Sequence, residues 1–366
     1  MKRATSADVA RQAGVSRSVV SAVLNGTPGI RVSEEKRRAV LQAIEDLGYR
    51  VDVQARGMRT GRSRCIGAYG NLDNPLFLQV LQGAQRVCTE AGYQLLLYGK
   101  GDRAGEREEL IALYRARRID GLITKDTTGY DDGDWADMVH AAGLPFVSVE
   151  GYPERSDISS ILMDYGASIE LALDYIWKQT GSAPCYVLAH HGDPSRLNWG
   201  DRHRLLAYRR WMELKGLSPQ IAEISLGEPD ELEAWTGLLA GKTLPAVLLC
   251  NWFVGCSRLY RACTGLGLAV GTDVRIMSAD NTAQANGFMV PSLSSVEVPY
   301  TEMGAAAARQ LIQSVEGNRE AEADQEAEGG RKAGEGREAE GGQEAHSAHS
   351  QSKLWIPPRL APRESM

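Results

Sequence analysis

The chain has 366 residues, 43% of them apolar, and carries 41 Lys/Arg against 47 Asp/Glu, for a formal net charge of −6. No apolar run reaches the roughly 18 residues of a membrane span, and the N-terminal residues lack the apolar core of a secretion signal. We therefore expect a cytoplasmic protein with no membrane partner. Taken whole, the charge also argues against a simple basic nucleic-acid-binding protein.

The charge is divided unevenly along the chain. Residues 1–64 hold 13 Lys/Arg and 6 Asp/Glu, a net charge of +7, which leaves −13 for the remainder. A basic segment attached to an acidic body indicates a small head with a different partner from the rest of the chain. The six cysteines are scattered without a CxxC pair, so we expect reduced thiols, no metal site and no cofactor.

Residues 5–48 predict three short helices. A capping box at Thr5-Ser6-Ala7-Asp8 places the first helix start near Ser6, and Gly14 ends that helix. Ser16 can cap a second helix that runs through Leu24, and Ser33 a third that stops at Gly48. The apolar residues expected to face inward are Val9, Ala10, Ala13, Val20, Val23, Leu24, Val40, Leu41, Ile44 and Leu47.

Two helices around a tight turn, braced by a third, form a helix-turn-helix, whose second helix enters the DNA major groove. The outer face of that helix is expected to show Arg17, Ser18, Ser21 and Ala22. Arg17 is the strongest base reader, because its guanidinium can donate two hydrogen bonds to guanine. The alternatives are a phosphate contact and a solvated arginine. Ser18 and Ala22 are weaker readers, and the methyl group of Ala22 could touch a thymine methyl.

The head resembles the LacI/GalR (lactose-repressor) family of bacterial transcription regulators. The residues that carry the resemblance are TSADVARQAGVS at 5–16 and VSAVLN at 20–25, continued by VS at 32–33, LGY at 47–49 and AR at 55–56. One departure is Val19, where the family usually has Thr, and we expect it to lower DNA affinity only. The DNA-binding residues that follow from the residues and the resemblance are Thr5, Ser16, Arg17, Ser18, Ser21, Ala22, Asn25, Arg56 and Met58.

Residues 50–63 are basic and too short for a domain. By composition alone they predict a flexible linker. The resemblance instead implies a hinge helix that folds on DNA and places Met58 as an apolar wedge in the minor groove. Asp52 stands at the start of this segment and could cap the helix.

From Arg64 onward, apolar strand runs alternate with amphipathic helices in two series that divide near Asp164. This order predicts an α/β body of two lobes with doubly wound parallel sheets and a small ligand at the carboxyl ends of the strands. The expected strands are 65–69, 93–98, 121–123, 145–149, 185–189, 221–225, 246–250 and 274–278. The expected helices are 75–90, 107–117, 137–142, 166–179, 203–214, 230–240 and 254–265.

The resemblance continues through the body in NPLF at 74–77, IDGLI at 119–123, MDY at 163–165 and RLLAY at 204–208. It implies the fold of periplasmic sugar-binding proteins, with an effector between the lobes. The implied effector contacts are Phe77, Asp164, Arg204, Asn251 and Asp280, and their chemistry suits a polyol. Trp252 follows Asn251 where the family has Asp, so Trp252 and Trp199 are candidate stacking surfaces, although a Trp is more often a core residue. Asp164 and Asp280 could equally be cap or turn residues, and Asn251 a turn at a strand end.

Residues 317–352 consist mainly of Glu, Gly, Ala, Gln and Arg, which predicts disorder because such a segment cannot bury a core. The resemblance implies a closing strand from Lys353. The predicted divisions are 1–49 for the head, 50–63 for the hinge, 64–162 with 292–317 for the first lobe, 163–291 with 353–366 for the second lobe, and 318–352 for a disordered insertion.

These features predict a sequence-specific DNA-binding transcriptional regulator of repressor type. We expect a homodimer on a pseudo-palindromic double-stranded operator, controlled by a small effector, a sugar or sugar derivative. The alternative is a solute- or sugar-binding protein, or a sugar-active enzyme, with an appended DNA-binding head. No catalytic residue is expected, because Gly265-x-Gly267 lacks the strand-to-helix context of a dinucleotide loop and His190-His191 has no partners at metal-ligand spacing.

Overall fold

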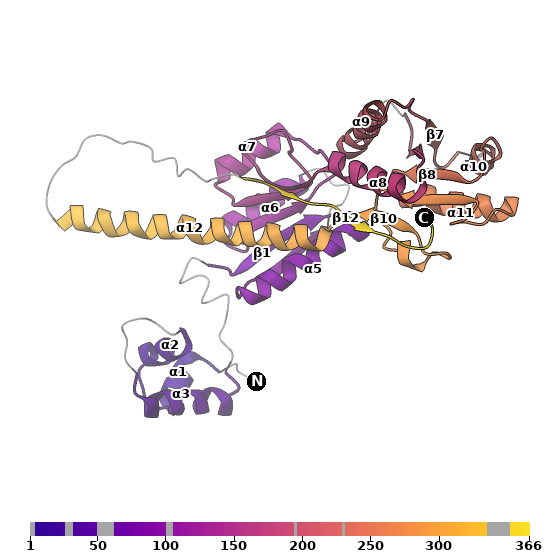
Figure 1. Cartoon of the computed structure of the whole chain (residues 1–366). Coiled ribbons are helices and arrows are strands. Elements are labelled where there is room, and N and C mark those ends of the chain that lie inside the picture. The colour runs from indigo at the N-terminus through magenta and orange to yellow at the C-terminus, as the bar shows by residue number, and fades with distance from the viewer. Residues whose placement is uncertain are drawn as a thin grey trace. The chain divides into compact units, whose positions relative to one another are not determined.

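The computed structural model describes residues 4–25, 32–49, 62–99, 105–193, 196–228, 231–334 and 352–366. The chain forms two compact units, Met1–Ser63 and Arg64–Met366 (Figure 1). The first unit is all-α in its described residues, and the second is α/β, as predicted. Among the helices of these ranges, none combines the length and apolar character that crossing a membrane requires.

The head consists of α1 (Ser6–Gln12), α2 (Arg17–Asn25) and α3 (Glu34–Asp46). Its core cluster consists of the buried residues Val9, Ala10, Val20, Val40 and Ala43. The predicted inward position of Leu41 is wrong, because its side chain is 52% exposed. The apolar stripe of α3 follows residues 40, 43, 44 and 47, and one residue along a helix turns the side chain by about 100°, so Leu41 lies outside that stripe.

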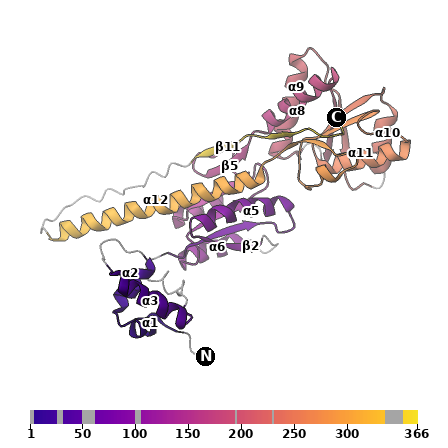
Figure 2. The same ribbon diagram turned by 60° about the horizontal axis from the view of Figure 1, so that its bottom comes forward.

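The first lobe of the body is built on a six-stranded parallel sheet in the order β11-β5-β4-β3-β1-β2. Its strands are β1 (Cys65–Gly70), β2 (Gln94–Gly99), β3 (Gly121–Lys125), β4 (Phe146–Val149), β5 (Ser159–Met163) and β11 (Lys353–Ile356). One face packs against α5 (Pro75–Glu90) and α12 (Tyr300–Gly334), which lie side by side in Figures 1 and 2. The other face packs against α6 (Glu106–Arg115) and α7 (Gly133–Ala142).

The second lobe has a sheet in the order β12-β10-β9-β8-β6-β7. Its strands are β6 (Cys185–His190), β7 (Ile221–Ser225), β8 (Ala246–Cys250), β9 (Val274–Ser278), β10 (Ser294–Glu297) and β12 (Arg359–Ala361), the last an antiparallel edge strand. The core on one face is completed by α8 (Tyr165–Thr180) and α9 (Trp199–Leu214). The core on the other face is completed by α10 (Glu231–Ala240) and α11 (Phe253–Leu266).

The sheet membership of two strands differs from the predicted division of the lobes. β10 was expected in the first lobe, within 292–317, but it pairs with β9 in the second sheet. β11 was expected in the second lobe, within 353–366, but it pairs with β5 in the first sheet. Pro357-Pro358 separates β11 from β12, so the predicted single closing strand is two strands in different sheets. The chain therefore passes between the sheets three times, after β5, after β10 and after β11.

The structure also differs from the prediction of disorder over 318–352. Helix α12 continues without a break to Gly334, so residues 318–334 are helical. Ala, Glu, Gln and Arg are strong helix formers, and a helix can persist in such a segment although it has little apolar surface to bury. Residues 335–351 lie outside the described residues.

Candidate DNA-binding face and effector site

Local hydrogen bonds set the geometry of the helix-turn-helix. Thr5 and Asp8 form the predicted capping box: the Thr5 backbone amide donates to Asp8 Oδ2 at 3.0 Å, and the Asp8 amide donates to Thr5 Oγ1 at 3.4 Å. Gly14 occupies the turn with a φ of +63°, a left-handed conformation that favours glycine. The Val19 amide then donates to Ser16 Oγ at 3.4 Å, so Ser16 caps α2 as predicted.

The exposed start of α2 carries the polar side chains that sequence placed there. Arg17 and Ser18 are exposed, and the hydroxyls of Ser16 and Ser18 lie 2.7 Å apart. Ser21 is half-buried, whereas the expected exposure of Ala22 is wrong, because Ala22 is only 5% exposed. A methyl group extends little beyond the helix backbone and is easily covered by its longer neighbours. In the isolated head, Ala22 therefore presents little surface to a thymine methyl.

Three of the expected DNA-binding groups cannot be placed. Arg56 and Met58 lie outside the described residues, as does the rest of the segment 50–61. The side chain of Asn25, the last residue of α2, also lies outside them. The hinge helix and its Met58 wedge therefore stay predictions.

In the second lobe, Asp201 collects four donors around its two carboxylate oxygens. Arg204 Nη1 and Asn251 Nδ2 donate to Oδ1 at 3.2 and 3.3 Å. Asn198 Nδ2 and Trp252 Nε1 donate to Oδ2 at 2.7 and 3.1 Å. The structure thus brings three expected effector residues, Arg204, Asn251 and Trp252, onto one buried carboxylate that sequence reasoning missed. Asn198 is the N-cap of α9 and Asp201 its third residue, so a capping pattern was the available signal.

The Arg204 guanidinium is buried and held from several sides, although its Nε–H has no hydrogen-bond partner. Its Nη2 donates to the Ala279 carbonyl at 2.9 Å, and its Cζ lies 4.7 Å from the centre of the Tyr165 ring. Burial alone would lower the pKa of Arg204, but the negative charge of Asp201 outweighs that effect and raises it. Arg204 is therefore a permanent cation that is held in place before any ligand arrives.

Asn251 and Asp280 also hold the backbone at strand ends, as the alternative interpretation expected. Asn251 is fully buried and exchanges two hydrogen bonds of 2.9 Å with the backbone of Ala189. Asp280 accepts from the Phe253 amide at 2.6 Å, at the start of α11, and from Ser278 Oγ at 3.1 Å. Burial raises the pKa of Asp280 against the opposing effects of these donors and of Arg204.

The remaining predicted contacts make interactions that do not involve Asp201. Asp164 is exposed and caps α8, accepting from the Ala167 amide at 2.8 Å. Phe77 is fully buried in the first lobe, with its ring so close to Gly70 at the end of β1 that a Cβ there would lie 2.8 Å from it. Trp199 stacks on His203 with ring centres 4.0 Å apart. None of these three shares a hydrogen bond with Asp201 in the described part of the chain.

The carboxyl edge of the first sheet has two ion pairs of its own. Lys125 Nζ lies 2.5 Å from Glu150 Oε2, and both side chains are at most 5% exposed. Glu150 Oε1 also accepts from the hydroxyls of Tyr165 and Tyr300. Tyr165 begins α8, just after β5, and Tyr300 begins α12, just after β10, so both lie where the chain passes from one sheet to the other. Glu150 has a φ of +73°, a strained value for a residue with a side chain. Glu150 thus ties two of the three inter-lobe connections to β4.

We expect Glu150→Gln to lower the free energy of unfolding of the body by about 3 kcal/mol, because it leaves the buried Lys125 without a counter-charge. Burial would raise the pKa of Glu150, but Lys125 and the tyrosine hydroxyls lower it overall. Its stabilisation is therefore complete above the ordinary carboxyl pKa of about 4.3 and is lost as the pH falls through the lower folded-state value. Urea unfolding between neutral and acid pH should show a flatter acid limb in Glu150→Gln. The exposed Glu154→Gln is the control and should behave as the parent protein.

The second pair is Arg107–Asp126. Arg107 Nη2 donates to Asp126 Oδ1 at 2.8 Å, while Ser148 Oγ donates to Asp126 Oδ2 at 2.8 Å. The guanidinium also lies over the rings of Tyr130 and Trp135, at 4.7 and 5.1 Å from their centres. Sequence reasoning missed this group, because its members come from four separate segments of the first lobe.

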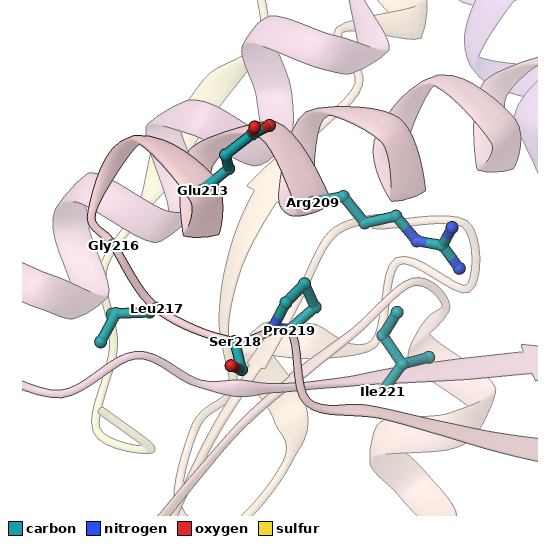
Figure 3. A pocket seen from close by; sticks show the side chains of 7 residues that line it. All are labelled: Arg209, Glu213, Gly216, Leu217, Ser218, Pro219 and Ile221. Carbon is teal, nitrogen blue, oxygen red and sulfur yellow. The ribbon is translucent and has the colours of Figure 1, made fainter.

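An open depression lies at the other end of α9 from Asp201 (Figure 3). Its lining residues are Arg209, Glu213, Gly216, Leu217, Ser218, Pro219 and Ile221. None of the expected effector residues is among them. The polar cluster around Asp201, and not this depression, is therefore the candidate effector site.

Comparison with known proteins agrees with this arrangement of head and body. Residues 5–52 match the model "Bacterial regulatory proteins, lacI family", and residues 183–331 match "Periplasmic binding protein-like domain". The chain is 27% identical over 326 residues to the HTH-type transcriptional repressor PurR of Serratia proteamaculans, covering 87% of this chain and 92% of that protein. The head thus matches the helix-turn-helix of lacI-family regulators, and the body matches periplasmic binding proteins. The chain is accordingly a DNA-binding transcriptional regulator of the LacI type, and no catalytic role is assigned to its residues.

Two solved structures show the same fold. The lac repressor dimer bound to operator and the anti-inducer ONPF superposes with a TM-score of 0.72 at 20% identity, covering 100% of this chain and 99% of that one. A complex of the transcriptional regulator CelR with cellobiose superposes with a TM-score of 0.58 at 21% identity and covers the whole of both chains. The predicted α/β body with two sheets is therefore confirmed as the fold of this protein.

Proposed function

We propose that this protein is a cytoplasmic repressor that binds a pseudo-palindromic DNA operator as a homodimer and responds to a sugar. The observation that carries the proposal is the exposed Arg17 at the start of a capped second helix, in a head that folds as a unit separate from the body. Two such heads, one from each protomer, would read the two half-sites of an operator. The lac repressor structure, a dimer on its operator, supports this arrangement.

The homodimer also has support in the second lobe. Phe288 and Val290, beside the short helix η2 (Asn286–Phe288), are 86% and 89% exposed. Large apolar side chains exposed together are typical of protein–protein contacts. We propose that they belong to the surface that joins two protomers.

The effector is proposed to bind at the Asp201 cluster, where Arg204, Asn251, Trp252 and Asp280 converge at the carboxyl ends of the second-lobe strands. Carboxylates and amides can accept from hydroxyls or donate to them, and an indole can lie against the apolar face of a sugar ring. Phe77 and Asp164 are proposed to complete the site from the first lobe and from the connection between the lobes. The CelR–cellobiose complex shows that this fold can hold a sugar.

The sugar and the operator are proposed to be coupled through the lobes. An effector that weakens DNA binding must itself bind the DNA-loaded protein more weakly by the same factor. The test selects binding sites from random duplex DNA with the full-length protein and repeats the binding in the presence of a panel of sugars. Recovery of a two-fold symmetric site whose affinity changes with one sugar is the expected result. Recovery of no preferred sequence would overturn the proposal.

We expect Arg17→Ala to relax the preference at one base pair in each half-site by about 1–3 kcal/mol, because one two-pronged base contact is lost. Anisotropy titrations of single-base operator variants measure this change. Arg11→Ala is the control, since Arg11 is exposed on α1 and pairs with Asp8 at 3.2 Å. An equal loss of affinity on every sequence would show that Arg17 contacts only phosphate.

A further inference from the structure

Two buried basic side chains, Lys125 and Arg204, and the half-buried Arg107 lie at the carboxyl edges of the two sheets, and each has a carboxylate of its own. Lys125 pairs with Glu150 at 2.5 Å, Arg107 with Asp126 at 2.8 Å, and Arg204 with Asp201 at 3.2 Å. The three partner acids are between 1% and 5% exposed. Across the described ranges of both lobes, no buried cation at these edges is left without a counter-charge.

We propose that the effector is an uncharged polyhydroxyl compound, and that Asp201 is the residue that makes the site reject phosphorylated and carboxylated sugars. The inference rests on the proposed function of the Asp201 cluster as the effector site. An anion needs a cation whose charge is not already compensated, and Arg204 is compensated: Nη1 donates to Asp201, and Nη2 donates to the Ala279 carbonyl. The Nε–H group is buried without a hydrogen-bond partner, and the hydroxyl of an uncharged ligand can accept from it. The ring of Tyr165 covers one face of the Arg204 guanidinium.

The remaining charges near Arg204 strengthen the rejection of anions. Asp280 is 5% exposed and acts electrostatically on Arg204, so two buried carboxylates, Asp201 and Asp280, oppose one guanidinium. A phosphate or carboxylate placed there would meet a net negative environment with little water to screen it. A sugar hydroxyl would not, because it can donate to a carboxylate and accept from an arginine without carrying charge.

Only a carboxylate can do what Asp201 does. Four donors, from Arg204, Asn251, Asn198 and Trp252, point at its two oxygens. An amide at this position has one accepting end, so its NH2 group would face two of these donors. Asp201→Asn therefore removes the compensating negative charge and weakens the Nη1 hydrogen bond, so that the Arg204 guanidinium has an uncompensated charge available for an anion.

Inorganic phosphate is the probe, because it reports anion binding without knowledge of the effector. Full-length protein and Asp201→Asn are titrated with phosphate at constant ionic strength, and binding is followed by calorimetry and by the melting temperature. The parent protein should show no saturable binding. Asp201→Asn should bind at least about tenfold more tightly than the parent, as expected for a charge-assisted contact, and Asp201→Asn/Arg204→Gln should lose the gain.

Glu213→Gln is the matched control, because it removes one negative charge from the far end of the same helix. It should behave as the parent protein. Saturable phosphate binding by the parent that Arg204→Gln abolishes would overturn the proposal, as would a folded Asp201→Asn that gains no binding. If Asp201→Asn does not fold, Asp126→Asn decides, because it frees Arg107 in the first lobe; a folded Asp126→Asn without phosphate binding would contradict the charge pairing. None of these outcomes depends on DNA binding, so failure of the repressor proposal is a separate result.

Discussion

Val40→Asp is expected to abolish operator binding, whereas Leu41→Asp, one residue further along the same helix, leaves it nearly unchanged. Val40 is fully buried in a small core cluster with Val9, Ala10, Val20 and Ala43, and Leu41 is 52% exposed. A carboxylate forced into that core has no partner and costs several kcal/mol, a large share of the stability of a domain this small. The head would unfold, and with it the start of α2 that presents Arg17.

The pair of variants separates folding from electrostatics. Both substitutions add one negative charge to α3, so repulsion from DNA is the same in each. Fluorescence anisotropy with operator DNA measures binding, and calorimetry of the full chain follows the melting of the body. The body transition should stay in place in both variants, because the head and the body are separate compact units. Equal loss of DNA binding in the two variants would show that charge, and not the core, accounts for it.

Sequence periodicity located most of the elements because their boundaries are local. The helix Pro75–Glu90 was predicted to the residue, since Asn74 caps it and Pro75 is tolerated at the first helical position. The strands Ile221–Ser225, Ala246–Cys250 and Val274–Ser278 also coincide with their apolar runs. β5 was missed, because it begins with Ser159-Ser160, which are typical of a loop. Which sheet β10 and β11 join depends on pairing between strands that are far apart in the sequence. The alternation of strands and helices along the chain does not predict that pairing.

One misplaced helix start explains why Asp201, the central residue of the proposed effector site, was missed. The sequence predicted a helix from about residue 203, but α9 begins at Trp199 with Asn198 as its cap. Only the earlier start puts Asp201 and Arg204 on the same helix, three residues apart, where side chains meet. Arg204 was selected from the sequence as a site candidate and Asp201 was not, although the charge of the proposed site depends on both. The predicted acceptors Asn251 and Asp280 also hydrogen-bond to the backbone at the ends of strands. The same residues therefore line the proposed site and fix the conformation of its backbone.

Gly83→Ala is expected to lower the free energy of unfolding of the body by about 3 kcal/mol, although it adds a single methyl group. Gly83 lies on α5 where it crosses α12, and a Cβ at this position would stand 1.8 Å from the Thr301 carbonyl oxygen. The contact is reciprocal, because a Cβ at Gly304 on α12 would stand 2.0 Å from the Val80 carbonyl oxygen. The backbones of the two helices are in contact here, and a backbone cannot relieve a clash by changing rotamer as a side chain can.

The opposite effect is expected at Gly237, in the interior of α10, where a Cβ would meet nothing within 4 Å. There the alanine should raise the free energy of unfolding by about 0.5–1 kcal/mol, because glycine loses more conformational freedom in a helix. Urea unfolding of the body compares the two variants with the parent protein. The contrast matters because α12 carries the chain back to the first lobe after β10, so the α5–α12 crossing anchors that return. A Gly83→Ala variant as stable as Gly237→Ala would mean that the two helices can separate without loss, and that the second passage between the lobes is not held by their packing.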